Sequence, residues 1–384
     1  SAINTLHDLS KESTPATPPA QQILAQYSGW GSLPEVFDYV PGQPAEAGKK
    51  DWAKEFKEMR QKSNELADVL NVSARDVYDK LRSSTQNAFY THPEVINGMY
   101  YILQHIGAPN GNILEPAMGI GNFFGLLPDK YLRSKLYGVE LDPIAGNIAK
   151  LLYPEANIQI TGFQKTRFPN NMFDVVIGNV PFGDVPIYDN EIKNKKLRSK
   201  IHNYFFVKSI NKVKPGGFVL FITSTGTLDS QDSQEVRNYL ANRANLVGAI
   251  RLPNNVFKEN AGTSVTTDII VLQKLQEGEI PTDIDWANIS PYTIDGKKYN
   301  LNNYYIKHPE MMLGNIVVDG LYGAQNRLAL EANSEDITAQ LANVIEEYFP
   351  KNIASPMTKH YTQDINLTSE ELGVKPGTVM EKNG

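Results

Sequence analysis

The chain has 384 residues, of which 41% are hydrophobic and 21% charged, a composition typical of a globular protein with a main domain and extensions. Cys is absent, which excludes disulfides, cysteine zinc sites and thiol nucleophiles, and the six His residues lack metal-ligand spacing, so we expect no metal. The net charge of −6 argues against a large DNA-binding face, because nucleic-acid binders are usually basic.

The sequence has no run of about 18 apolar residues, so we expect no membrane span. The first residues, Ser1-Ala2-Ile3-Asn4, have neither the charged nor the apolar region of a signal peptide, and they lack Met. We therefore expect a segment of a longer, cytoplasmic protein.

The first 85 residues divide into a lead-in and a helical part. Residues 1–20 are rich in Ser, Thr, Pro and Ala, which predicts a flexible lead-in. From Asp51 to Leu70 apolar residues recur at helical spacing, so we interpret 51–85 as two short helices that pack on the main domain.

From residue 112 onward, short β-rich runs alternate with helical patterns, which predicts an α/β fold with a doubly wound, mostly parallel sheet of seven strands. Buried parallel strands are almost continuously apolar, and the runs 174–178 and 217–222 have this character. We leave open whether the last strand runs antiparallel at one edge. The predicted strands are 112–117, 136–141, 157–162, 173–179, 217–223, 246–252 and 268–274, and the helices between them are 122–127, 143–152, 202–213 and 230–243.

A glycine-containing turn follows the first predicted strand. Glycines let the backbone approach a ligand closely where a strand turns into a helix. The spacing is not the dinucleotide fingerprint, and the Lys-Ser/Thr of a phosphate loop does not follow. On this pattern alone, a ligand loop and an ordinary turn both remain open. The turn is Glu115-Pro116-Ala117-Met118-Gly119-Ile120-Gly121-Asn122-Phe123.

The second predicted strand ends in Glu140-Leu141-Asp142. An acid about 20 residues beyond a glycine turn suits a carboxylate that binds the two ribose hydroxyls of a ligand. Glu140 is therefore the ribose candidate, and a solvated acid at a strand end is the alternative.

The fourth predicted strand runs into Asn179-Val180-Pro181-Phe182. A turn explains Asn and Pro, but it does not explain an aromatic residue at an exposed edge. A methyl-transfer site explains the whole motif. The amide oxygen of Asn179 and a backbone carbonyl accept the N–H bonds of an aromatic amine, which frees its lone pair for attack on a sulfonium methyl group, while Phe182 stacks on the base. Positioning and hydrogen bonds then supply the rate without a catalytic His or Glu.

A basic run follows the motif. If the base that carries the amine lies inside a nucleic-acid duplex, modifying it requires flipping it out, and the protein then needs contacts that hold the nucleic acid. We expect these residues to contact phosphate or cover the flipped base; a solvated loop is an equally good interpretation of the charges. The run comprises Lys193, Lys195, Lys196, Arg198 and Lys200.

Residues 277–384 are polar, with one amphipathic helix around 336–348, and predict a smaller C-terminal unit. Sequence readout needs several side chains that reach base edges, and this region shows no such set. We divide the chain into a flexible lead-in with a helical N-terminal extension (1–85), a main domain (86–276) and a C-terminal extension (277–384) that is a candidate for part of a target-recognition region.

The order of these motifs resembles the amino-methyltransferases with an (Asn/Asp)-Pro-Pro-(Tyr/Phe) motif, especially the γ-class adenine-N6 DNA methyltransferases. The resemblance covers about residues 86–275. It implies the class I S-adenosylmethionine-dependent methyltransferase fold, S-adenosyl-L-methionine as cofactor, DNA as substrate and a restriction-modification or mobile-element context. The cofactor residues that it implies are Phe89, Tyr90, Thr91, Glu115, Pro116, Ala117, Gly119, Gly121, Asn122, Phe123, Glu140, Leu141, Gly162, Phe163 and Gln164, with Glu115 near the amino group and Phe163 beside the adenine.

Two positions depart from that family's pattern. Val180 stands in place of the first Pro of the motif, where the expected role belongs to a backbone carbonyl that Val also supplies. Gly162 replaces the acid that binds the adenine amino group of the cofactor, and we expect the side-chain amide of Gln164 to substitute.

Two further segments, Gln26–Gly31 and Arg251–Phe257, are similar to a narrower group: large proteins of phages and conjugative elements that join such a methyltransferase to a helicase. The implied partners are DNA and a helicase or recognition region of the same full-length protein. Two other functions stay open: N-methylation of another amide or amine, such as protein glutamine or RNA guanine, and a catalytically idle DNA-binding module of the same fold.

Overall fold

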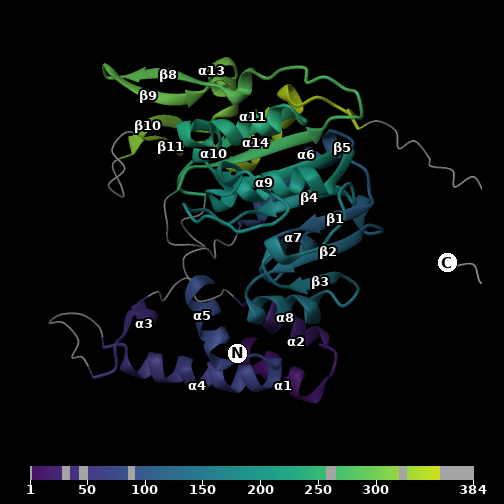
Figure 1. Cartoon of the computed structure of the whole chain (residues 1–384), viewed down its shortest axis with the longest axis vertical. Helices are drawn as coiled ribbons and strands as arrows, with labels where there is room; N and C mark the ends of the chain where they lie inside the picture. The colour runs from purple at the N-terminus through teal and green to yellow at the C-terminus, as the bar shows by residue number, and fades with distance from the viewer. Residues whose placement is uncertain are drawn as a thin grey trace, which may run out of the picture.

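The computed structural model describes residues 2–27, 35–42, 51–84, 91–256, 265–319 and 327–354. A seven-stranded sheet lies at the centre, with helices packed against it (Figure 1). Its strands are β1 (Asn112–Glu115), β2 (Lys135–Glu140), β3 (Asn157–Ile160), β4 (Phe173–Asn179), β5 (Val213–Ser224), β6 (Ala244–Leu252) and β7 (Thr267–Lys274). The helices around the sheet are α6 (Pro93–His105), α7 (Asn122–Gly125), α8 (Pro143–Leu152), α9 (Ile201–Lys212), α10 (Gly226–Asp229) and α11 (Gln234–Ala241).

The strand order is β3-β2-β1-β4-β5-β7-β6, which confirms the expected α/β fold with a mostly parallel sheet of seven strands. The chain builds outward from β1 through β2 to β3 and then returns to the other side of β1 as β4, which pairs with it in parallel. The order therefore reverses between β1 and β4. Open sheets of this kind bind ligands beyond the carboxyl ends of the strands at such a reversal.

Local sequence explains the elements that form this edge. All but the last residue of β4 are buried, as an apolar strand between two neighbours requires. The helix α8 begins at Pro143, and the side chain of Asp142 accepts a hydrogen bond from the amide of Ile144. This cap and the N-terminal Pro fix where β2 ends and the helix starts.

The position of β7 corrects one part of the prediction. β7 does run antiparallel, but it lies between β5 and β6, and β6 forms the edge. The first six residues of β7 are buried, as expected of a strand that is covered on both faces of the sheet. The guanidinium of Arg251 on β6 also donates to Asp268 on β7 at 2.7 and 2.9 Å, which links the two strands in register.

The expectation of a flexible lead-in over residues 1–20 is wrong. Residues 2–12 and 18–24 form helices, and Leu6 and Leu24 are buried. Their apolar residues pack with the two predicted helices of 51–85, which are confirmed, and with one face of α8, so that a second small core forms. The composition of this segment did not indicate the helices, because a few apolar side chains at helical spacing are enough to pack a short helix against a core. These helices are α1 (Ala2–Glu12), α2 (Pro18–Leu24), α3 (Glu35–Asp38), α4 (Ala53–Leu70) and α5 (Ala74–Ser84).

The C-terminal extension shares the core of the main sheet. Trp286, Leu301 and Ile345 belong to the same hydrophobic cluster as β4 and β5. The extension adjoins the edge strand β6, where the amide of Leu313 donates to the carbonyl of Arg251 at 3.0 Å. The N-terminal helices lie below α8 at the β3 side of the sheet (Figure 1). Its elements are the paired strands β8 (Ile289–Ile294) and β9 (Lys297–Asn302), the pair β10 (Asn315–Asp319) and β11 (Arg327–Glu331), and the helices α13 (Asn303–Lys307) and α14 (Ile337–Tyr348).

A buried charged cluster joins this extension to the sheet. Arg251 is 1% exposed and pairs with both Asp268 and Asp229, and its guanidinium lies 4.3 Å from the ring centroid of Tyr305 on α13. Removing one member of a buried ion pair leaves a charge without compensation, at a cost of about 3–5 kcal/mol. Arg251, which the narrower resemblance singled out, is thus a structural residue.

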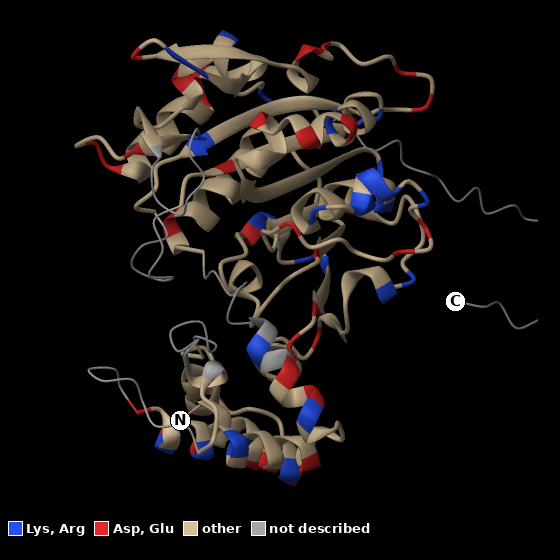
Figure 2. Cartoon of the chain, turned by 60° about the vertical axis from the view of Figure 1, so that its left-hand side comes forward, with Lys and Arg blue, Asp and Glu red and all other residues tan. Residues whose placement is uncertain are grey.

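No described helix is long and apolar enough to cross a membrane. Within the described ranges, no three His, Asp or Glu side chains are grouped as metal ligands. Residues of both charge signs are interspersed along α4 and over the rest of the view in Figure 2, rather than gathered into one basic face.

Candidate functional site at the carboxyl ends of the strands

The tips of β1 and β4 touch. A Cβ built on Gly178 would lie 3.5 Å from Cγ of Glu115 and 3.8 Å from Cδ of Pro116. Asn179 follows directly at the end of β4. The motif and the glycine turn therefore lie next to each other at the reversal of the strand order, which is the geometry that the methyl-transfer hypothesis requires.

The glycine turn has one tightly packed glycine and one open glycine. Gly119 and Gly121 both have left-handed backbone angles, with φ of +56° and +88°. A Cβ at Gly121 would meet the ring of Tyr153 at 2.6 Å, whereas a Cβ at Gly119 would meet nothing within 4 Å. The space beside Gly119 is thus where a ligand can approach the backbone.

Glu140 connects the ends of the first two strands. Its carboxylate accepts hydrogen bonds from the backbone amides of Gly119 and Asp142, each at 2.7 Å. The carboxylate therefore lies at the glycine turn, and its predicted role as the ribose-binding acid stays a prediction.

Glu115 is the most unusual acid of the site. It is 2% exposed, and its Oε2 atom has no hydrogen-bond partner among the described residues. Burial, and to a smaller extent the neighbouring charge of Glu140, raise the pKa of Glu115 well above its ordinary value. Burying a carboxyl oxygen without a hydrogen-bond partner costs folding free energy. A bound ligand that donates a hydrogen bond to this atom would remove that cost.

Asn179 is oriented by a residue from the segment before α6. Its Nδ2 atom donates to Oγ1 of the buried Thr91 at 3.1 Å, so the amide oxygen faces away from Thr91. The next amide, of Val180, donates to the carbonyl of Ile222 on β5 at 3.2 Å. Phe182 is half-buried and packs against the core, which leaves part of its ring accessible.

The predicted adenine-binding positions follow β3. Phe163 is buried, with its ring 5.2 Å from that of Phe205. A Cβ at Gly162 would lie 2.5 Å from Oε1 and 2.6 Å from Nε2 of Gln164. The side-chain amide of Gln164 thus fills the place that a side chain at position 162 would take.

Three further predicted cofactor residues lie in or next to the glycine turn or at the end of β2. Phe123 at the start of α7 is buried, and Tyr100 donates to its carbonyl at 2.8 Å. Ala117 packs against the core, and Leu141 is 45% exposed. Phe89 and Tyr90 lie outside the described residues, so their predicted role stays a prediction.

The basic run after the motif contains residues of different kinds. Arg198 donates to the carbonyls of Ile187 and Ile192 and thereby holds the loop together. Lys196 pairs with Glu235 at 3.1 Å, and Lys200 pairs with Asp184 at 3.3 Å. Lys193 and Lys195 are exposed.

The loop that carries this run is fastened to α9. Asp189 accepts hydrogen bonds from Nζ of Lys208 at 2.8 Å and from the hydroxyl of Tyr204 at 2.6 Å, and all three side chains are buried. The chain from the motif to α9 is therefore built as part of the domain.

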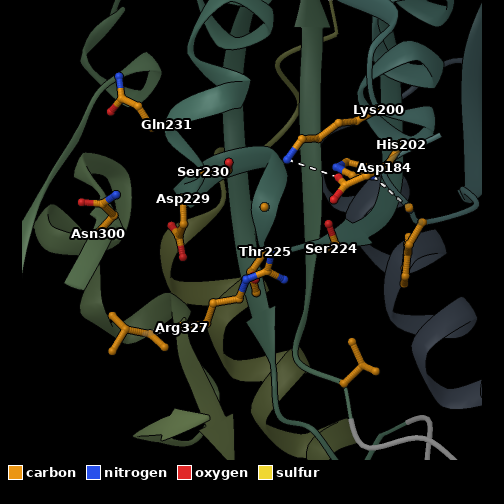
Figure 3. Close-up of a pocket in the computed structure, with 15 residues that line it drawn as sticks. Asp184, Lys200, His202, Ser224, Thr225, Asp229, Ser230, Gln231, Asn300 and Arg327 are labelled. Carbon is orange, nitrogen blue, oxygen red and sulfur yellow. Dashed lines mark hydrogen bonds and ion pairs between the residues drawn. The ribbon is translucent and has the colours of Figure 1, made fainter. Parts of the chain in front are cut away.

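A pocket of about 500 Å³ opens beside the motif, and the sequence analysis did not foresee it (Figure 3). Segments from the motif, α9, the end of β5, α10 and the C-terminal extension line it, and they are far apart in sequence, so no local motif signals them. The lining residues are Phe182, Gly183, Asp184, Lys200, His202, Ser224, Thr225, Gly226, Asp229, Ser230, Gln231, Val265, Asn300, Arg327 and Leu328.

Comparison with known proteins adds an independent line of argument. A family model described as N-6 DNA Methylase matches residues 76–344, more than half of the chain. Over 266 residues, or 63% of the chain, the sequence is 29% identical to the defense against restriction protein B of Escherichia phage P1, of which the match covers 12%. It is 26% identical over 159 residues to an uncharacterised protein of Bacillus subtilis (strain 168), covering 38% of the chain and 46% of that protein.

Among solved structures, the chain is similar to the methyltransferase subunit of a type I restriction-modification system from Streptococcus thermophilus. The TM-score is 0.42 at 15% identity, over 91% of this chain and 79% of that one. The chain spans less than half the length of either sequence relative named above.

Proposed function

The chain belongs to the N-6 DNA methylase family, and we propose that it transfers a methyl group from S-adenosyl-L-methionine to the N6 amino group of adenine in DNA. One observation carries the proposal: Asn179, oriented by Thr91, ends β4 where β4 touches the glycine turn. This brings the candidate acceptor of an amine N–H next to the candidate cofactor turn.

The chemistry needs few groups. The lone pair of an exocyclic amine is delocalised into its ring, so the amine is a weak nucleophile. We propose that Oδ1 of Asn179 and the carbonyl of Val180 accept its two N–H bonds and turn the lone pair toward the methyl group. The cofactor would supply the methyl group: a nitrogen–carbon bond would replace the carbon–sulfur bond, the electron pair of the broken bond would stay on sulfur, and the extra proton of the amine would leave to solvent. Phe182 would hold the plane of the base by stacking.

The residues around the glycine turn fit the cofactor, which supplies the electrophilic methyl group when bound. The α-amino group of S-adenosyl-L-methionine is a cation that donates hydrogen bonds. Oε2 of the buried Glu115 accepts no hydrogen bond from the described residues, so it is a suitable acceptor for that group. The open space at Gly119 admits a ligand beside the backbone, and Glu140 lies at the same turn for the ribose hydroxyls. Gln164 would offer its amide oxygen to the adenine amino group in place of the acid absent at Gly162.

We extend the proposal to the division of the chain. The domain from 86 to 276 would carry the chemistry, and the extension from 277 would supply part of the target side, since Asn300, Arg327 and Leu328 line the pocket beside Phe182. Because the chain covers only a small part of its phage relative, further DNA recognition, or a helicase, would come from other regions of a full-length protein.

The test is transfer of a tritiated methyl group to genomic DNA, with whole-cell protein and RNA as competing substrates. We expect label in DNA, recovered as N6-methyladenine after digestion. Label in protein glutamine or RNA guanine instead would overturn the substrate class. Binding of the cofactor with no transfer to any of the three would favour a catalytically idle module.

A further inference from the structure

The pocket beside the motif holds a buried donor without a partner. His202 on α9 is 3% exposed. Its Nδ1 atom accepts the backbone amide of Gly183 at 3.4 Å, so the neutral ring carries its proton on Nε2. Nε2 is buried and has no hydrogen-bond partner among the described residues. Burial is the main reason that the pKa of His202 falls to about 4, so the ring is neutral near pH 7 and Nε2–H is a donor only.

The charges of the pocket are balanced except at one side. Lys200 pairs with Asp184 at 3.3 Å, and Asp229 pairs with the buried Arg251 at 2.8 Å. Arg327, at the start of β11, is exposed and forms no ion pair within the described part of the chain. It lies across the pocket from His202 (Figure 3).

The pocket therefore offers three features in one space. An aromatic ring, that of Phe182, lies at the motif, a neutral donor lies inside, and an uncompensated cation lies opposite. A nucleotide has matching parts: a flat base, ring nitrogens that only accept, and a phosphate. The volume of the pocket is also suitable for a nucleotide, since pockets of about 300–1,000 Å³ hold small-molecule ligands.

We propose that this pocket receives the flipped deoxyadenosine of the substrate strand, with a ring nitrogen of the base accepting from Nε2–H of His202 and the adjoining phosphate bound by Arg327. The inference rests on the proposed function and deepens it, because it names the residues that hold the target. His202 also positions the motif, since the same ring accepts from Gly183, the residue after Phe182. The contact with Gly183 requires the neutral ring with its proton on Nε2, so the tautomer that orients the motif is also the one that presents a donor to the target.

The first experiment replaces one ring nitrogen of the target at a time. Single-stranded poly-dT oligonucleotides carry one central adenosine, or its 1-deaza, 3-deaza or 7-deaza analogue, and their Kd values are measured by fluorescence anisotropy with S-adenosyl-L-homocysteine present. A lost neutral hydrogen bond weakens binding by about fivefold. We expect one of the three analogues to lose this factor with the unaltered protein.

His202 variants assign that loss to the ring. In His202→Phe, adenosine should bind about fivefold more weakly, and the sensitive analogue should lose nothing further. His202→Gln retains an acceptor and a donor and should restore discrimination. Equal binding of adenosine and all three analogues by the unaltered protein, or unchanged discrimination in His202→Phe, would overturn the role of His202.

The second experiment tests the phosphate contact at an exposed position, where substitution does not threaten folding. Arg327→Gln should weaken every oligonucleotide equally and reduce the slope of log K against log salt by about 0.7. Arg133→Gln is the matched control, because Arg133 is exposed just before the amino end of β2, whereas the motif lies at the carboxyl ends of the strands. An unchanged slope in Arg327→Gln, or an equal change in Arg133→Gln, contradicts the assignment.

These results are separable from the proposed function. Methylation of genomic DNA by the unaltered protein, together with failure of both variants to alter binding, would leave the function standing and remove the pocket assignment. Discrimination between the analogues that depends on His202, without methyl transfer to DNA, would support the pocket assignment and contradict the proposed function.

Discussion

The two halves of the site are built in different ways. Most of the cofactor half comes from one stretch, Glu115 to Leu141, in which the ends of β1 and β2 bring a glycine turn and two acids together. The target half collects side chains from residue 182 to residue 328, including the C-terminal extension. A local stretch leaves a motif in the sequence, whereas an assembled surface does not. The first half is acidic and the second carries an unbalanced cation, which matches a cationic cofactor and an anionic substrate.

The largest effect should arise where the halves meet. Asn179→Ala removes the oxygen that orients the amine, so we expect kcat to fall by about 10²–10³-fold. The Kd of the cofactor, measured by calorimetry, should change little because the turn is intact. Retained transfer would contradict the role of Asn179, and a parallel loss of cofactor binding would show that the halves are not separable.

The target half should make the free energy of unfolding depend on pH, through His202. Burial and then Lys200 lower the pKa of His202 from 6.5 to about 4, with Asp184 opposing and Arg327 adding a small effect. The unfolded chain therefore binds more protons than the folded chain between these values. Stability is fully present above pH 6.5 and declines as the pH falls toward 4, by at most about 3 kcal/mol. Urea unfolding across this range checks the slope, which His202→Gln should flatten; an identical slope in both proteins would assign it to other groups.

The cofactor half should respond to pH in the same sense, but through the affinity for the cofactor rather than through the free energy of unfolding. The pKa of Glu115 is raised in the free protein, and a cation placed beside it lowers that pKa, so cofactor binding releases a proton. Affinity should therefore increase with pH. Calorimetry in two buffers of different ionisation enthalpy measures the release, which should vanish in Glu115→Gln together with about tenfold of affinity. Oligonucleotide binding is the control and should be unchanged.

The smallest effect concerns the substitution at the adenine position. Gln164→Ala removes an amide that covers Gly162, and we expect cofactor Kd to rise about fivefold. The double variant Gly162→Asp with Gln164→Ala should recover it, because Gly162 has an ordinary φ of −72° and the space is vacated. No recovery would mean that Gln164 does not replace the acid.

The same contrast explains what the sequence could predict. All seven strands and the two helices of 51–85 were predictable, since apolar runs and helical spacing are local signals. The place of β7 was not, because whether a strand lies at an edge depends on which neighbour it finds. The helices of 2–24 were missed because their burial depends on α8, more than a hundred residues away. Similarly, His202 and Arg327 have no common motif, and only the fold brings them to one pocket.

One small feature connects the N-terminal helices to the chemistry. Ile120 stands between the two glycines of the turn, is 3% exposed, and packs into the small core that the N-terminal helices form with α8, rather than into that of the sheet. Coupling between two sites is reciprocal. If the packing of these helices increases the affinity of the turn for a ligand, binding of that ligand stabilises the packing of the helices by the same free energy. Trp52, which packs at the rim of that core, thus becomes an intrinsic fluorescent reporter of occupancy at a distance.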